Sequence, residues 1–287
     1  MKLSSTSKAN ILSKILSLLF SLLSLRKKKV QINFHNDENI FDYPEDNWNF
    51  VPFPDQKGIP FNADNLSTVN RHSFIEDENF KQSLRVAESR WQSSGFSRNI
   101  AWRLKVFLWA FGLNLNHKSK QESVFIECGT GKGYMAAGAC DYFKFDNKDL
   151  PFYLIDLFQD SLDSDYETKK ETKSFNTYDA YTSNVEEVKN FFKKYTSVRI
   201  IKGKIPNAFD EIKINQILFV HIDLNDHVAE KLALDYLIKY FIDGTVILFD
   251  DYGGPGGQEQ AKIHEDFAKA NNKELLIMPT GQALIIW

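Results

Sequence analysis

Short apolar runs alternate with polar or amphipathic stretches from residue 124 to the end of the chain. The runs have the length of buried strands, and several of the stretches between them carry apolar residues at helical spacing. This alternation is typical of an α/β domain with a mostly parallel sheet. The predicted strands are 124–127, 151–156, 198–201, 216–223 and 245–250, and the predicted helices are 134–143, 185–194, 229–241 and 259–270.

Two apolar runs, 275–278 and 283–287, close the chain and are joined by Pro279-Thr-Gly281. This order predicts an antiparallel hairpin at the end of the parallel sheet. We therefore expect an α/β fold over residues 120–287, with a doubly wound, Rossmann-like sheet.

Residues 31–119 combine an extended segment, rich in Asn, Asp, Pro and aromatics, with two stretches of helical spacing. One predicted helical face contains Phe80, Leu84, Ala87 and Trp91, and the other contains Ile100, Leu104, Phe107 and Leu108. These stretches predict a helical cap that precedes the first strand of the domain.

Residues 1–30 differ from the rest, because the apolar run 11–25 is followed by Arg26-Lys-Lys-Lys29. A helix of this length spans about 22 Å, less than the ~30 Å hydrocarbon core of a bilayer. A signal peptide would carry small residues rather than a basic cluster at its end. Two interpretations stay open: an interfacial helix with peripheral membrane contact through residues 11–29, or a tail helix that packs on protein.

Charge and cysteine content restrict the partners and the compartment. The chain has 35 basic and 38 acidic residues and a net charge of -3, so we expect no nucleic-acid partner. Its two cysteines, Cys128 and Cys140, make neither a disulfide framework nor a zinc site, which favours a reducing, cytoplasmic compartment. The sequence leaves open whether the chain forms a homo-oligomer.

Three glycines at alternate positions follow the first predicted strand in Val124-Phe-Ile-Glu-Cys-Gly-Thr-Gly-Lys-Gly-Tyr134. The chain does not match the dinucleotide fingerprint G-x-G-x-x-G, because its third glycine comes one residue early. It does not match the phosphate-loop pattern G-x-x-x-x-G-K-[ST] either, because Lys132 is followed by glycine and Ile126 stands where the first glycine should be. This spacing disfavours a nicotinamide-dependent oxidoreductase. The pattern E-x-G-x-G-x-G resembles the first motif of class I S-adenosylmethionine-dependent methyltransferases. The resemblance implies a cofactor site at Glu127, Gly129, Thr130, Gly131, Gly133 and Tyr134, with the acid holding the turn and the cofactor's amino group.

Asp156 ends the second predicted strand. A carboxylate at this position can accept hydrogen bonds from both ribose hydroxyls of a nucleoside cofactor. We therefore expect Asp156 to bind S-adenosylmethionine, with a helix cap as the alternative.

Two later strands also end in acids, the first at Asp223 and the second at Asp250 and Asp251. The carboxyl ends of parallel strands meet at one edge, where ligands bind. Three close carboxylates repel one another unless a cation compensates, and oxygen ligands suit Mg²⁺ or, less selectively, Mn²⁺ or Ca²⁺. The alternative is that Asp223 and Asp250 are unrelated helix caps.

Four segments resemble the macrocin O-methyltransferase family: His221-Ile-Asp-Leu-Asn-Asp226, Phe241-Ile-Asp-Gly244, Val246-Ile-Leu-Phe-Asp-Asp-Tyr-Gly253 and Pro279-Thr-Gly-Gln-Ala283. Members are class I enzymes that methylate sugar hydroxyls of natural products with a divalent cation. The resemblance covers about residues 120–287. It implies that Glu127, Gly129, Gly131 and Asp156 bind S-adenosylmethionine and that Asp223, Asp250 and Asp251 bind the metal.

The general base departs from the family pattern. Members commonly carry Asp-x-Asp at the end of the fourth strand, where the second acid is assigned as the base, but this chain has Asn225, which cannot take a proton. Asp226 and His227 are the nearest substitutes, and with Asp223 they are the candidate catalytic residues. His221 shares a strand face with Asp223.

The expected function is S-adenosylmethionine-dependent O-methylation of a small acceptor, with assistance from a divalent metal. The acceptor would be a sugar-containing or other natural-product-like molecule. The missing second acid and the anchor-like N-terminus motivate an alternative, a non-catalytic cofactor-binding scaffold that is recruited to a membrane.

Overall fold

The computed structural model describes residues 61–63, 66–68, 70–91, 99–145, 150–158, 183–252 and 257–287. The predicted helix within residues 1–30 lies outside the described residues, as do residues 159–182. Within the part of the chain that is described, no helix is both long and apolar enough to cross a membrane.

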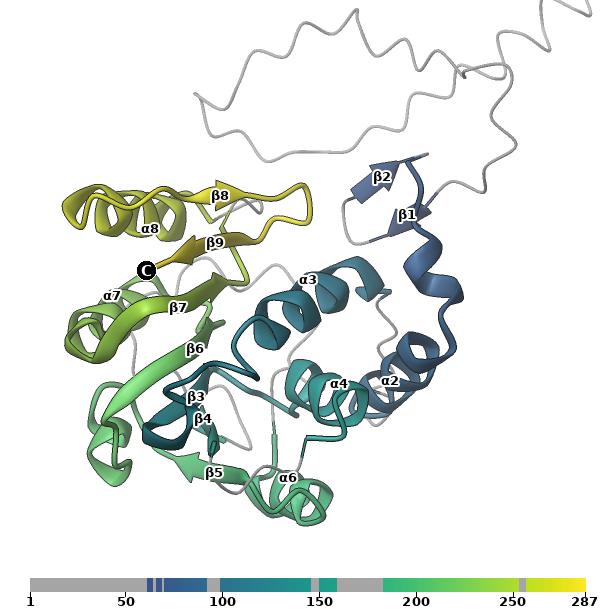
Figure 1. The fold of residues 1–287 in the computed structure, drawn as a ribbon, viewed down its shortest axis with the longest axis horizontal. Coiled ribbons are helices and arrows are strands. Elements are labelled where there is room, and N and C mark those ends of the chain that lie inside the picture. Colours follow the sequence, from purple (N-terminus) through teal and green to yellow (C-terminus); the bar gives the residue numbers. More distant parts are fainter. Residues whose placement is uncertain are drawn as a thin grey trace, which may run out of the picture. The chain divides into compact units, whose positions relative to one another are not determined.

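A seven-stranded sheet has the order β5-β4-β3-β6-β7-β9-β8 (Figure 1). Its strands are β3 (Ser123–Cys128), β4 (Phe152–Asp156), β5 (Val198–Lys202), β6 (Gln216–Ile222), β7 (Phe241–Phe249), β8 (Leu276–Ile277) and β9 (Ala283–Ile286). Each of the strands β5, β4, β3, β6 and β7 is parallel to its neighbours in this series, whereas β9 is antiparallel to both β7 and β8. The prediction of a mostly parallel sheet with a C-terminal antiparallel hairpin is confirmed.

Helices cover both faces of this sheet. One hydrophobic core contains residues of α2 (Glu78–Glu88), α3 (Ala101–Gly112), α4 (Tyr134–Tyr142) and α6 (Val185–Phe192). The other contains residues of α7 (His227–Leu237) and α8 (Gln258–Ala270). Figure 1 shows the same division, with α7 and α8 on the opposite side of the sheet from α3 and α4. The 3-10 helices are η1 (Ser73–Glu76), η3 (Lys120–Glu122), η5 (Asn207–Glu211) and η6 (Ile238–Tyr240).

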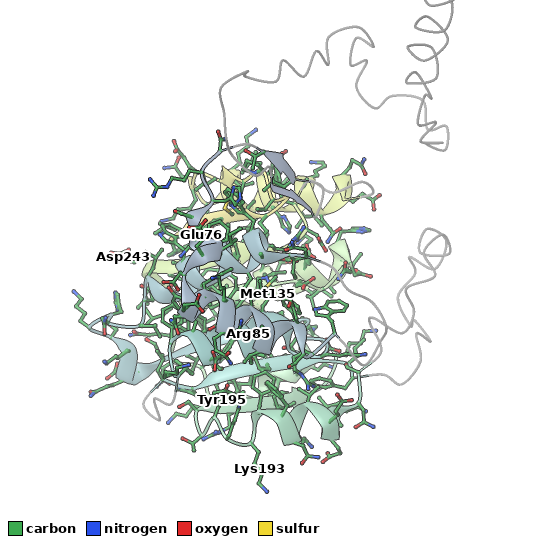
Figure 2. All side chains as sticks on the ribbon, turned by 90° about the vertical axis from the view of Figure 1, so that its right-hand side faces the viewer. Glu76, Arg85, Met135, Lys193, Tyr195 and Asp243 are labelled. Carbon is green, nitrogen blue, oxygen red and sulfur yellow. The ribbon has the colours of Figure 1, made fainter. Side chains whose placement is uncertain are left out.

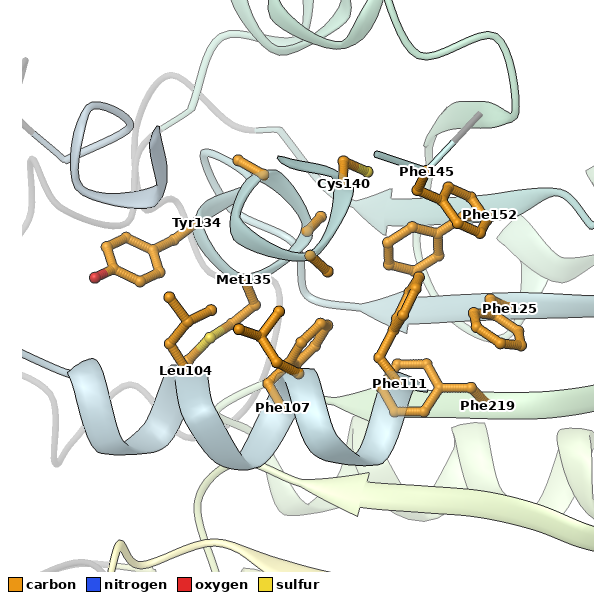
Figure 3. Close-up of a cluster of buried hydrophobic side chains, with 14 of the residues drawn as sticks. Leu104, Phe107, Phe111, Phe125, Tyr134, Met135, Cys140, Phe145, Phe152 and Phe219 are labelled. Carbon is orange, nitrogen blue, oxygen red and sulfur yellow. The ribbon is translucent and has the colours of Figure 1, made fainter. Parts of the chain in front are cut away.

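The predicted cap helix α3 forms part of the layer that covers the sheet. Its Phe111 ring lies 4.7 Å from Phe125 of β3, 5.2 Å from Phe152 of β4 and 5.4 Å from Phe219 of β6, between ring centroids (Figure 3). Each fully buried phenylalanine of this kind contributes roughly 1.5–3 kcal/mol. Residues before the first strand of the sheet are thus fixed on its face.

Surface and core side chains separate clearly. Lys193 and Asp243 are exposed and project outward, whereas Met135 of α4 lies inside (Figure 2). Cys128 and Cys140 are buried free thiols, and burial raises the pKa of both.

Three elements differ from the prediction. Helix α7 spans His227–Leu237 rather than 229–241, and residues 238–240 form η6. Strand β7 begins at Phe241 rather than at residue 245, because Phe241 pairs with Ile217 before the register shifts along β6. A short hairpin of β1 (Phe61–Ala63) and β2 (Leu66–Thr68) lies in the predicted extended segment. Strands of three residues are too short to give a periodic pattern.

Candidate active site

The glycine turn follows β3 and passes close to the ends of two neighbouring strands. Gly129, Gly131 and Gly133 all have positive φ, at 87°, 52° and 83°. The Gly129 amide donates to the Ile155 carbonyl of β4 at 2.8 Å. On the other side, a Cβ at Gly129 would lie 1.8 Å from the Asp223 carbonyl oxygen, after β6. Glycine is therefore required where the turn fits between the two strand ends.

Glu127 is 2% exposed, and both of its carboxylate oxygens have partners within the protein. Oε2 accepts from the Thr130 hydroxyl at 2.7 Å, and Oε1 lies 3.0 Å from Nδ1 of His221. These contacts account for the expected role of Glu127 in holding the turn, and the predicted contact of Thr130 with the cofactor stays a prediction. Contact of Glu127 with a cofactor's amino group stays a prediction.

Asp156 also binds the glycine turn directly. Its Oδ2 accepts from the Gly131 amide at 2.8 Å, and its Oδ1 accepts from the Phe158 amide at 2.9 Å. Burial raises the pKa of Asp156, and these amides oppose that shift. Since a carboxylate has about four lone-pair sites, these bonds leave acceptor capacity for ribose hydroxyls, and that role stays a prediction.

Tyr134 begins α4, and its side chain is buried in the core rather than exposed at the turn. Its ring centroid lies 5.8 Å from that of Trp91, and the side chain belongs to the cluster drawn in Figure 3. Gly133 precedes α4 as its N-cap residue, and no side chain caps this end of the helix. Its N-terminal amides are therefore the polar groups that this end of the turn offers to an anionic ligand.

The predicted acidic groups meet at the carboxyl edge of the sheet. Strands β6 and β7 are parallel neighbours, with Ile222 opposite Phe249, so the next residues, Asp223 and Asp250, lie side by side. One potential ligand atom each from His221, Asp223 and Asp250 lie within 4.8 Å of one another. The residue that caps α7 is Asp226, so the alternative in which Asp223 is that cap is wrong.

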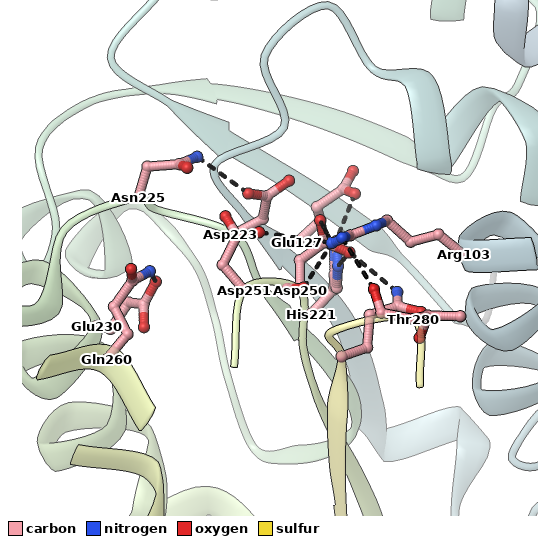
Figure 4. A network of polar contacts seen from close by, with 11 residues as sticks. Arg103, Glu127, His221, Asp223, Asn225, Glu230, Asp250, Asp251, Gln260 and Thr280 are labelled. Atoms are coloured by element: carbon pink, nitrogen blue, oxygen red, sulfur yellow. Dashed lines mark hydrogen bonds and ion pairs between the residues drawn. The ribbon is translucent and has the colours of Figure 1, made fainter. Parts of the chain in front are cut away.

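Two buried cationic side chains and one buried amide contact Asp250 (Figure 4). Its Oδ2 accepts from Nη1 of Arg103 at 2.7 Å, and its Oδ1 accepts from Nε2 of Gln282 at 2.9 Å. Nε2 of His221 lies 3.4 Å from the same Oδ1, while its Nδ1 faces Glu127. His221 therefore links the acid of the glycine motif to the acidic edge.

The charged groups at this edge shift one another's pKa values. Burial alone would lower the pKa of His221, but the Asp250 and Glu127 carboxylates outweigh it and raise the pKa to about 10. Burial would raise the pKa of Asp250, but Arg103 and His221 outweigh it and lower the pKa. For Asp223, burial and the repulsion of Asp250 and Asp251 raise the pKa well above its usual value. The cluster therefore favours the protonated form of Asp223 more than that of Asp250.

Asn225 and the candidate bases Asp226 and His227 lie next to this cluster, and each makes a local contact within the protein. Asn225 has a φ of 52° and donates from Nδ2 to Oδ1 of Asp223 at 3.1 Å. Asp226 caps α7 by accepting from the Ala229 amide at 2.9 Å. Nδ1 of His227 lies 3.2 Å from Oε2 of Glu259 on α8. A catalytic role for Asp226 or His227 stays a prediction.

Arg103 and Gln282 belong to the site although neither was predicted as a site residue, and Gln282 lies in the segment 279–283 that carries part of the family resemblance. Arg103 lies in the apolar helix α3, and Gln282 lies just before β9. One signal was present, since an arginine within a helix that is otherwise mostly apolar needs a buried partner. Only the packing of α3 on the sheet shows that this partner is Asp250.

Residues 126–252 match the model of a family described as a methyltransferase domain. This part of the chain is a methyltransferase domain. The family match confirms the predicted enzyme class, and the matched residues include the glycine turn and Asp156, Asp223, Asp250 and Asp251. Arg103 and Gln282 lie outside the matched residues.

Two solved structures share the fold. The O-methyltransferase NovP is 15% identical, with a TM-score of 0.52, over 64% of this chain and 78% of its own. The calicheamicin methyltransferase CalS11 is 15% identical, with a TM-score of 0.51, over 76% of this chain and 95% of its own. A search of curated proteins finds no match. The class I methyltransferase fold is thus confirmed, and membership of the macrocin O-methyltransferase family stays a prediction.

Proposed function

We propose that the chain transfers a methyl group from S-adenosylmethionine to a hydroxyl oxygen of a small acceptor, with a divalent cation at the acidic edge. The acceptor would be a sugar-containing or other natural-product-like molecule. Two neighbours in fold, an O-methyltransferase and a calicheamicin methyltransferase, support this class of acceptor.

The observation that carries the proposal is the contact between the glycine turn and the acidic edge. The backbone of Gly129 packs directly on the carbonyl of Asp223, and His221 connects Glu127 to Asp250. A cofactor bound over the turn would therefore lie next to an acceptor bound at the edge. Such proximity supplies much of the rate in a transfer from an already reactive donor.

The protein's own groups would position the two reactants. Asp156 and the amides of the turn would bind the nucleoside and the amino-acid part of S-adenosylmethionine, which supplies an electrophilic methyl group on sulfur. The acceptor oxygen would form the new bond to the methyl carbon as the carbon–sulfur bond breaks, with the electron pair leaving on sulfur. The hydroxyl proton would pass to a base, for which Asp223, Asp226 and His227 are the candidates.

The donor set fits a divalent cation. When all are ionised, the four carboxylates of Glu127, Asp223, Asp250 and Asp251 exceed the two cationic side chains Arg103 and His221 by two charges. Carboxylate oxygens are the ligands that Mg²⁺ prefers. Asp223, Asp250 and Asp251 would bind the ion, which would lower the pKa of an acceptor hydroxyl. His221 is the fourth nearby group, but its two nitrogens face carboxylates.

The proposal is tested by calorimetric titration of S-adenosylmethionine, and then of Mg²⁺ into the cofactor complex. Asp156→Ala should weaken cofactor binding by at least about tenfold, because it removes the acceptor of the Gly131 amide. Asp223→Ala should leave cofactor binding largely intact and abolish Mg²⁺ binding. Incubation with a panel of sugar-containing hydroxyl compounds, followed by mass spectrometry, should then show an acceptor heavier by one methylene.

Each failure has a different meaning. No binding of S-adenosylmethionine would refute the proposed activity. Cofactor binding without a Mg²⁺ response would refute the metal assistance alone. Cofactor binding without transfer to any acceptor in the panel would favour the non-catalytic scaffold.

A further inference from the structure

One nitrogen of Arg103 lies among oxygens that the proposed cation would use. Nη1 is 2.7 Å from Oδ2 of Asp250, 2.6 Å from the Asp250 carbonyl and 3.5 Å from Oδ1 of Asp251. Figure 4 shows the guanidinium entering the cluster from α3. Two of the three predicted metal ligands are therefore already in contact with a positive charge.

The Arg103 side chain is held at its backbone and at its guanidinium group. The next residue in α3, Leu104, is fully buried in the core, and Nη2 of Arg103 donates to the Thr280 carbonyl at 3.0 Å. The arginine side chain is only 8% exposed. Its charge stays at the acidic edge unless this set of hydrogen bonds breaks.

We infer that Arg103 competes with the divalent cation for Asp250 and Asp251 and so lowers the metal affinity of this site. The inference rests on the proposed function, because it concerns the cation assigned there. A guanidinium and a divalent cation repel each other, and few water molecules screen them at a buried site. Binding of the metal then requires Nη1 to release at least one carboxylate.

Removal of Arg103 should leave the remaining ligands close to their places. Gln282 donates to Oδ1 of Asp250 independently of Arg103, and Asn225 donates to Asp223. The cluster would gain one net negative charge, and Oδ2 of Asp250 would become available to a metal. A purely structural role for Arg103 predicts the opposite, since a displaced Asp250 would weaken metal binding.

The test uses the full chain saturated with S-adenosylhomocysteine, which prevents turnover. Mn²⁺ is titrated, and the loss of the free-ion signal in electron paramagnetic resonance gives its affinity. Arg103→Met should bind Mn²⁺ at least about tenfold more tightly than the wild type, equivalent to about 1.4 kcal/mol. Arg103→Lys retains the charge and should stay within about threefold of the wild type. Arg90→Met is the matched control, because Arg90 is also buried but binds the Lys132 carbonyl of the turn.

Three results would overturn the inference. Equal or weaker Mn²⁺ binding by Arg103→Met would show that Arg103 supports the ligands rather than competing with the ion. Tight binding by Arg103→Lys would show that charge is not the cause, even if Arg103→Met does not fold. No Mn²⁺ binding by any variant would refute both the inference and the metal assistance, whereas methyl transfer without added metal would show that the proposed activity itself stands.

Discussion

Replacement of Gly129 by alanine tests whether the glycine turn and the acidic edge form one packed unit. The φ of Gly129 is 87°, and an added Cβ would lie 1.8 Å from the oxygen and 2.6 Å from the carbon of the Asp223 carbonyl. Both contacts are with backbone, which cannot rotate away as a side chain would. The strand end that carries Asp223 must therefore shift.

The expected loss follows from two contributions. A left-handed backbone costs alanine about 1–2 kcal/mol, and forced displacement of a packed neighbour adds about 1–3 kcal/mol. Gly129→Ala should therefore lower the free energy of unfolding by about 2–5 kcal/mol. Equilibrium unfolding in urea, followed by circular dichroism, measures this value.

Gly131→Ala is the matched control. Gly131 also has a positive φ, 52°, but an added Cβ would meet nothing within 4 Å. The control should lose only the backbone contribution of about 1–2 kcal/mol. Because the methyl group would occupy open space at the turn, where we propose that the cofactor binds, it should also weaken binding of S-adenosylmethionine by about tenfold.

Equal losses of stability in the two variants would refute the reasoning. That result would mean that the turn does not pack on the Asp223 carbonyl. Unchanged cofactor binding in Gly131→Ala would place the cofactor elsewhere.

Two further predictions concern the edge of the site. If Asp226 acts mainly as a cap, Asp226→Ala should cost about 1 kcal/mol in urea unfolding, whereas Asp226→Asn should cost only a few tenths; equal costs would contradict the cap. Because the pKa of His221 is raised to about 10, its ion pairs stabilise the fold fully below about pH 6.5, and this contribution is lost as the pH rises towards 10. His221→Gln should therefore show a flatter fall in stability between these pH values, and parallel curves would contradict the assignment.

The order of elements in this protein follows from its sequence pattern. Apolar runs and helical spacing predict the strands and helices of the sheet, because local burial imposes periods that the chain must match. The glycine motif and the acids at strand ends mark the candidate site in the same way. Gly129, Asp156 and Asp223 could be predicted as site residues from the sequence, because the position of each depends only on where one strand ends.

Contacts between distant residues were decided by the tertiary structure alone. The sequence places Arg103 in an apolar helix, but only the packing of α3 against β7 brings its guanidinium to Asp250. Likewise, Gln282 reaches Asp250 because β9 is antiparallel to β7. The charge balance at the acidic edge, and hence its affinity for a cation, depends on these contacts. Periodicity reports which residues are buried, whereas only the packed structure determines which buried charges face one another.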